Sequence, residues 1–194
     1  MHMARRGLTF VQKEKKLNMN LVKKILEWIF EIAVVLFLAF VLVYFFGEKV
    51  VNVGESMSPT LENGDTVLVN KLNYSITGPS RGDVVVFKPH GNENTHYYIK
   101  RVVGLPGETV EIKEGKIYID GEVLEEELET EPVQEAGVAA SLVKLGEDEY
   151  FVLGDNRNNS EDSRSADVGD VLKKHMLGKA WFVLSPKERF GYLK

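Results

Sequence analysis

The sequence predicts a mainly β protein, with an antiparallel β domain behind one N-terminal membrane-spanning helix. A long apolar run extends from Trp28 to Phe46. After Gly47 the pattern changes to short β-branched runs with period-two alternation, as in half-buried strands. Turn-type dipeptides separate these runs. The strands are too short and too closely spaced for parallel βαβ units, so the sheet is predicted to be antiparallel.

Residues 1–27 are predicted to form a basic cytoplasmic arm and the start of a helix. Residues 1–30 carry seven basic and two acidic side chains, whereas residues 48–194 carry 17 basic and 26 acidic ones. A basic arm alone would suggest nucleic acid as a partner. Because an apolar run follows it, we interpret the arm as a cytoplasmic flank and expect no nucleic-acid partner.

Residues 28–46 are predicted to cross a membrane once. This run holds a single charge, Glu31, and as a helix would extend about 28 Å, close to the roughly 30 Å core of a bilayer. Trp28 and Tyr44 would lie at the two interfaces. The alternatives are a cleaved secretory signal and a buried core helix. The first lacks a small-residue exit site after Phe46, and the second is rarely so continuously apolar.

Residues 47–194 are predicted to form the outer β domain. Glu114-Gly115 and Asp120-Gly121 are typical of tight turns and would bracket a hairpin strand. Residues 170–177 suggest a short helix that ends at Gly178. The predicted strands are residues 50–53, 66–69, 83–87, 97–103, 109–113, 116–119, 150–153 and 179–184.

Residues 122–149 interrupt this pattern. They hold ten acidic side chains and one lysine. We expect an acidic insertion on the rim of the β domain, flexible at least in part. A docking role for substrate is the alternative to a solvated loop.

The composition restricts the available chemistry. The chain has no cysteine, which excludes disulfides, zinc–thiolate sites and a thiol nucleophile. None of the four histidines (His2, His90, His96 and His175) lies in a metal-binding pair. We therefore expect no metal and no cofactor.

Ser56 is a candidate nucleophile. Its stretch begins at Gly54, eight residues after the apolar run ends, and Ser56 lies between Gly54 and Pro59, where a turn would fix its hydroxyl. A serine hydroxyl needs a base near neutral pH. A Ser-His-Asp triad is possible, but no histidine is placed to favour it.

Lys100 is the other candidate base. Alternation in residues 97–104 puts Tyr98, Lys100 and Val102 on one face of a strand and Ile99 on the other. Burial among apolar neighbours disfavours the ammonium form and lowers a lysine's pKa, so that a neutral amine could accept the serine proton. The alternative is a solvated strand lysine.

The polar stretch 154–164 follows an apolar strand. Asp162 and Arg164 could pair, and Ser160 could form a hydrogen bond with a buried amine. Such a loop is suited to orienting a base. A polar surface loop is the alternative.

Four stretches, residues 56–61, 81–87, 98–107 and 154–164, resemble in order the sequence boxes of bacterial type I signal peptidases. The similarity extends from the apolar run to Arg164. The single span and small insertion resemble the compact form of that family. The resemblance implies a mainly β Ser-Lys peptidase fold and a membrane-anchored serine endopeptidase that removes signal peptides from exported preproteins.

The resemblance also assigns roles to single residues. Ser56 would be the nucleophile and Lys100 the general base, with Ser160 orienting the lysine amine. Asp162 and Arg164 would form a structural ion pair. The residues implied to line the substrate pockets are Met57, Leu61, Tyr98 and Ile99.

The remaining implications concern substrate and location. The family cuts after Ala-x-Ala-like sites, so preproteins and the lipid bilayer are the expected partners. The catalytic domain would lie on the outer side of the bacterial cytoplasmic membrane. Some relatives carry an oxyanion-binding serine where this chain has Gly54, which leaves the second oxyanion donor open. The alternatives are an inactive signal-peptide-binding relative, a self-cleaving Ser-Lys peptidase, and a specialised signal peptidase.

Overall fold

The structure, a computed structural model, describes residues 18–72, 74 and 77–193. It divides between Phe40 and Val41 into two compact units. Helix α1, Met19–Phe46, contains neither proline nor glycine, and none of its residues is buried. In the described part of the chain, it is the one helix long and apolar enough to cross a membrane. It begins nine residues before the predicted span, and residues 1–17 of the predicted arm lie outside the described residues.

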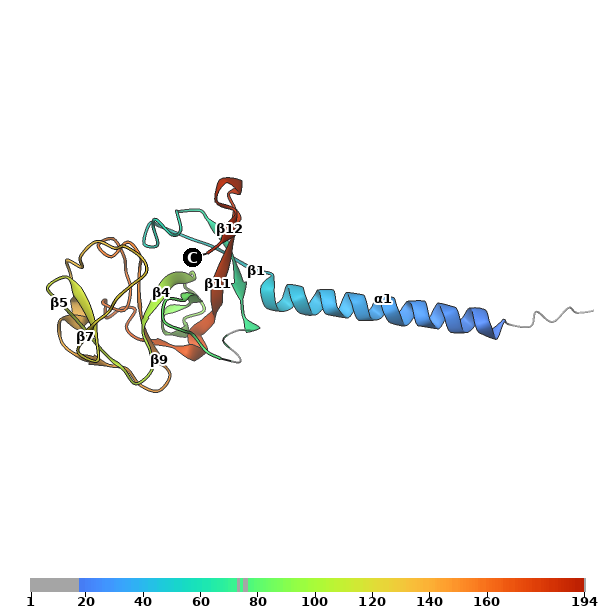
Figure 1. Cartoon of the computed structure of the whole chain (residues 1–194), viewed down its shortest axis with the longest axis horizontal. Coiled ribbons are helices and arrows are strands. Elements are labelled where there is room, and N and C mark those ends of the chain that lie inside the picture. The colour runs from blue at the N-terminus through green and yellow to red at the C-terminus, as the bar shows by residue number, and fades with distance from the viewer. Residues whose placement is uncertain (1–17, 73, 75–76, 194) are drawn as a thin grey trace, which may run out of the picture. The chain divides into compact units, whose positions relative to one another are not determined.

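The larger sheet is antiparallel and runs in the order β1-β2-β11-β3-β4-β9-β10, with β12 paired to β11. Its long strands match the predicted ones to within three residues. In the β unit, β4 and β9 lie between β5 and β7 on one side and β11 and β12 on the other (Figure 1). The strands are β1 Glu48–Val51, β2 Thr66–Asn70, β3 Val84–Phe87, β4 Tyr98–Gly104, β9 Glu149–Leu153, β10 Val171–Leu172, β11 Met176–Ser185 and β12 Gly191–Tyr192.

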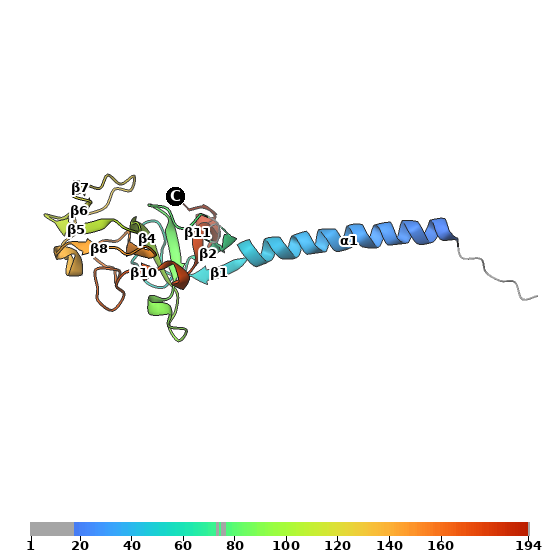
Figure 2. The same cartoon turned by 90° about the horizontal axis from the view of Figure 1, so that it is seen from below.

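The smaller sheet has the order β7-β6-β5-β8, visible as a stack in Figure 2. Its strands are β5 Thr109–Lys113, β6 Lys116–Ile119, β7 Glu122–Val123 and β8 Val143–Lys144. The predicted hairpin is confirmed: β5 and β6 pair across Glu114-Gly115, and β6 and β7 across Asp120-Gly121. All four turn residues have positive φ, as a two-residue type I′ hairpin loop requires.

Buried apolar side chains of the β unit form three clusters. Strand β3 is buried along its whole length, because it lies between β4 and β11 near the middle of the larger sheet. Ile99 packs in one cluster and Tyr98 and Val102 in another, which confirms the predicted alternation along β4. Strand β4 is thereby fixed from both faces.

The helix predicted at residues 170–177 is wrong. Val171 and Leu172 instead pair with β9, a single 3₁₀ turn, η3 Lys173–His175, follows, and β11 begins at Met176. Gly178 is part of β11, where a Cβ would lie 2.4 Å from the carbonyl oxygen of Asn70. The glycine therefore permits close approach of β11 and β2 and does not end a helix. The other 3₁₀ turns are η1 Pro89–Gly91, η2 Gly137–Ala140 and η4 Lys187–Arg189.

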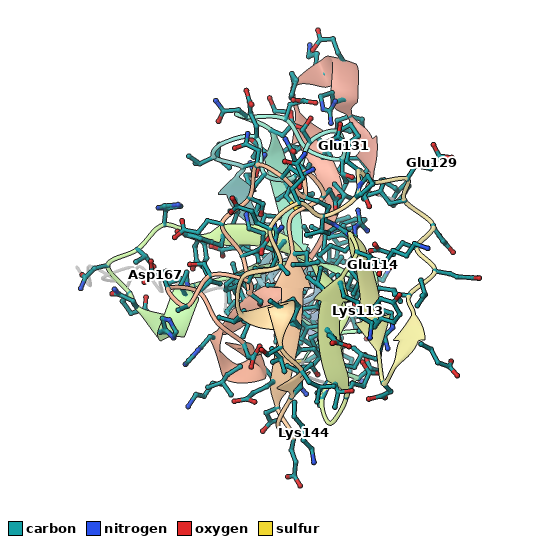
Figure 3. All side chains as sticks on the ribbon, turned by 90° about the vertical axis from the view of Figure 1, so that its left-hand side faces the viewer. Lys113, Glu114, Glu129, Glu131, Lys144 and Asp167 are labelled. Atoms are coloured by element: carbon teal, nitrogen blue, oxygen red, sulfur yellow. The ribbon has the colours of Figure 1, made fainter. Side chains whose placement is uncertain are left out.

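The acidic insertion contains β7, η2 and β8 and packs on the remainder of the β unit. Val133, Ala139 and Leu145 are buried in the cluster beneath the smaller sheet. Figure 3 looks onto this side, with Glu129 and Glu131 above Glu114. The solvated, partly flexible loop expected from composition is therefore a segment with its own core contacts.

Candidate active site

The turn that follows β1 brings Ser56 to Lys100. Nζ of Lys100 donates a hydrogen bond to Oγ of Ser56 at 2.5 Å, across 44 residues of sequence. Lys100 lies in the middle of β4, opposite Val85 of β3, so the sheet sets its position. The basic group in contact with the serine is thus a lysine and not a histidine.

Lys100 is 4% exposed. Burial lowers the pKa of its ammonium group to about 8, although the carboxylates of Asp162, Glu161 and Asp155 raise it and Arg164 lowers it further. A lysine with such a pKa has a substantial neutral fraction in mildly alkaline solution. When Lys100 is neutral, the contact with Ser56 can reverse, with the hydroxyl donating to the amine.

Asp162 is the centre of the polar network beside this pair. Its Oδ2 accepts hydrogen bonds from the hydroxyl of Ser160 (2.7 Å) and the backbone N–H of Gly154 (3.0 Å). The predicted ion pair is present: the guanidinium of Arg164 donates to both carboxylate oxygens at 2.8 Å. Ser160 lies in this network, and its role in orienting the amine of Lys100 stays a prediction.

The same loop holds the backbone of Ser56. The N–H of Asn156 donates to the carbonyl of Ser56 (3.0 Å), and its side-chain amide donates to the carbonyl of Glu55 (3.2 Å). A Cβ on Gly154 would lie 2.2 Å from Oγ of Ser160 and 2.5 Å from the carbonyl oxygen of Ser56. Only glycine allows the two segments to approach this closely.

The sequence analysis does not identify Arg101 and Asp155 as site residues. Both lie in stretches that resemble the signal peptidase boxes, residues 98–107 and 154–164. Nε of Arg101 donates to Oδ1 of Asp155 (2.8 Å) and Nη2 donates to Oδ2 (2.7 Å). Arg101 also bonds to the carbonyl of Gly82 and to the hydroxyl of Thr60. This buried pair fastens the polar loop to the strand that carries Lys100. The sequence feature that could have indicated this pair is the position of Arg101 directly after the candidate base Lys100.

Ser56 and Lys100 line a groove of about 280 Å³. Tyr98 and Ile99 line it, as expected for substrate-contacting residues. Met57 and Leu61 are fully buried in the core cluster that includes Ile99, so they support the groove from beneath. Direct contact of these two residues with substrate stays a prediction.

Gly54 also borders the groove. It has a φ of +88°, and no atom lies within 4 Å of a Cβ placed on it. Its N–H donates to the side chain of Asn63 (2.9 Å). The positive φ favours glycine here and agrees with the absence of a side-chain donor at this position.

Comparisons with known proteins identify a matching family and several similar chains. The family described as "Signal peptidase, peptidase S26" matches residues 25–185. The chain is 36% identical over 189 residues to signal peptidase I P of Bacillus subtilis subsp. natto, covering 94% of this chain and 98% of that protein. It is 39% identical over 166 residues to probable signal peptidase I-1 of Synechocystis sp., covering 82% of each. A crystal structure of a signal peptidase I from Enterococcus faecalis aligns at 35% identity with a TM-score of 0.43, covering 57% of this chain and 99% of that one.

Proposed function

The chain belongs to the signal peptidase family, peptidase S26, and on that premise we propose that Ser56 and Lys100 are its nucleophile and general base. The protein is a serine endopeptidase that removes signal peptides from preproteins. The observation that carries the proposal is the 2.5 Å contact between Oγ of Ser56 and Nζ of a buried Lys100.

The geometry supports a two-step acyl transfer. Neutral Lys100 accepts the proton of Ser56 as Oγ attacks the carbonyl carbon of the scissile bond. The resulting ammonium donates that proton to the leaving amine, and an acyl-enzyme remains at Ser56. Lys100 then accepts a proton from the water that attacks the ester and gives it to Oγ as the bond between Oγ and the acyl carbon breaks, which restores the serine and neutral Lys100. Asp162, Arg164 and Ser160 are positioning residues in this scheme.

The backbone N–H of Ser56 is proposed as an oxyanion donor. No hydrogen bond from this N–H is found among the residues 18–72, 74 and 77–193. An N–H aimed at the developing oxyanion stabilises the transition state more than the ground state. The second donor is left to a backbone group, water or substrate, since Gly54 has no side chain.

The finer features of substrate and location are proposed with the same support. The apolar helix α1 and the signal peptidase relatives indicate a membrane-anchored enzyme. We propose that the N-terminus is cytoplasmic, that residues 47–194 lie on the outer side, and that cleavage follows an Ala-x-Ala-like site. A substrate anchored in the same bilayer would meet the site at a high effective concentration.

A serine-directed acylating reagent tests the dyad and the alternative of an inactive binding protein together. Wild-type protein is incubated with the reagent, and the labelled peptide is identified by mass spectrometry. We expect a covalent adduct at Ser56 that is lost in both Ser56→Ala and Lys100→Ala. An adduct that forms equally in Lys100→Ala would exclude the lysine as the base.

A further inference from the structure

Glu161 lies in the groove beside the dyad but belongs to neither the dyad nor the Asp162 network. The hydroxyl of Tyr98 donates to Oε2 of Glu161 at 3.0 Å. The ring of His96 stacks on that of Tyr98, with centroids 5.0 Å apart. All three side chains line the 280 Å³ groove together with Ser56 and Lys100. A carboxylate held by a tyrosine hydroxyl therefore lines the same groove as Ser56 and Lys100.

We propose that Glu161, held by Tyr98, is a specificity-determining residue that disfavours acidic and favours basic side chains next to the cleaved bond. The inference rests on the proposed function, because it takes this groove as the place where the preprotein binds. Small neutral residues, such as alanine, carry no charge and would be unaffected. The proposed charge preference therefore acts on those substrate residues beside the cleaved bond that bind along the groove.

The physical basis is the change in surroundings when substrate binds. Glu161 is exposed in the free protein, where water and salt screen its charge. A peptide in the groove displaces that water, and the effective dielectric constant falls. A charge about 8 Å from the carboxylate would then alter binding by about tenfold. Glu55, which also lines the groove, has the same sign and strengthens the preference.

Glu161 also influences Lys100, which gives an independent readout. The charged groups facing Lys100 are Asp162, Glu161 and Asp155, which raise its pKa, and Arg164, which lowers it. Removing the charge of Glu161 leaves the pKa of Lys100 lower. The rise of activity with pH in Glu161→Gln is therefore expected at lower pH than in wild type, a change that a purely structural role would not produce. The other titratable side chains that line the groove, Glu55, His96, Tyr97 and Tyr98, are retained in every variant.

The test uses full-length protein and preproteins that differ only in Lys or Asp at one residue flanking the cut, with each flanking residue taken in turn. The ratio of kcat/KM for the Lys over the Asp substrate is compared between wild type and Glu161→Gln at one fixed pH. Because the carboxylate favours Lys about tenfold and disfavours Asp about tenfold, we expect the ratio to fall about 100-fold at one or more of these positions, and to invert in Glu161→Lys. Glu129→Gln is the matched control: Glu129, labelled in Figure 3, is not among the residues that line the groove, so removal of its charge should leave the ratio unchanged.

Two outcomes separate this inference from the proposed function. If Glu161→Gln and Glu161→Lys cleave preprotein with the wild-type ratio at every flanking position, the charge preference is wrong and the dyad stands. If Ser56→Ala still cleaves the Lys and Asp substrates, the proposed function itself is wrong. Thermal melting of each variant identifies any loss of the fold, and Glu161→Lys provides the test if Glu161→Gln does not fold.

Discussion

The burial of Lys100 lowers the stability of the folded protein whenever its amine is protonated. Its pKa of about 8 in the fold, against 10.5 for a free side chain, corresponds to about 3 kcal/mol of stability lost when the amine is protonated. The penalty is absent above pH 10.5, grows as the pH falls, and is complete below about pH 8. A buried and partly neutral amine in contact with a serine is what a general base requires, so this loss of stability accompanies function.

The first prediction is the pH dependence of cleavage. The neutral form of Lys100 is the active one, and its fraction rises with pH through about 8. We expect kcat/KM for a preprotein to rise about tenfold per pH unit well below pH 8 and to level off above it. A profile that is flat from pH 6 to pH 9 would contradict this assignment.

The second prediction concerns Gly154. A methyl group here would overlap Ser160 and the carbonyl of Ser56, so Gly154→Ala must displace the nucleophile, the polar loop, or both. We expect about 100-fold less activity and a stability loss of about 1–3 kcal/mol, measured by cleavage assays and thermal melting. Gly191→Ala is the control, because no atom lies within 4 Å of its new methyl group. Full activity in Gly154→Ala would show that this close approach is not needed.

The sequence predicted Ser56 and Lys100 separately, but their contact followed only from the resemblance. Alternation along β4 placed Lys100 on a strand face, and no local rule connects it with a serine 44 residues away. The Asp162–Arg164 pair was predictable because the two residues are close in sequence. Arg101–Asp155 and Tyr98–Glu161 were not, because each joins separate elements.

At the scale of elements, the acidic insertion is joined to the loop that holds the site. The guanidinium of Arg157 donates to both carboxylate oxygens of Glu126, at 2.8 and 2.6 Å, and to the carbonyl of Gly154. Arg164 also donates to the carbonyl of Glu135. Composition alone suggested a solvated loop, since nothing distinguishes Glu126 from its nine acidic neighbours in sequence. The helix predicted at residues 170–177 failed similarly, because pairing with β9 outweighed a weak helical pattern.

The third prediction tests this connection. Glu126→Ala leaves the buried guanidinium of Arg157 without its carboxylate partner, and we expect a loss of about 3 kcal/mol in unfolding free energy. Activity should fall as well, since Arg157 contacts the backbone of Gly154. Denaturant unfolding and cleavage assays measure the two effects. The neighbouring Glu125 is exposed, and Glu125→Ala should stay within about 0.5 kcal/mol of wild type. Equal stability of the two variants would show that the Glu126–Arg157 ion pair does not stabilise the loop that holds the site.

At the scale of the whole molecule, the order of parts was the most predictable feature. An uninterrupted apolar run, then short alternating strands, predicted one long apolar helix followed by an antiparallel β domain, and both are present. The short strands β7, β8, β10 and β12 were missed, because two residues carry no periodicity. Strand order was also beyond the sequence, since β11 pairs with β2 and β3 across about a hundred residues.

The fourth prediction is the topology. The lysines and arginines before the apolar run should hold the N-terminus in the cytoplasm. In right-side-out membrane vesicles, protease added from outside should digest residues 47–194. The protein should stay with the membrane after a high-salt wash and leave it in detergent. Protection of residues 47–194 in intact vesicles, with digestion after lysis, would reverse the assigned orientation.

Preprotein cleavage by the dyad variants tests the central claim most directly. Wild type, Ser56→Ala and Lys100→Met are incubated with a preprotein, and the product is identified by N-terminal sequencing. Lys100→Met keeps much of the side-chain volume and removes the amine, and circular dichroism verifies that each variant is folded. We predict one new N-terminus with wild type and at least about 10⁴-fold less product with either variant. Near-wild-type cleavage at the same bond by folded Lys100→Met would contradict the Ser56–Lys100 mechanism.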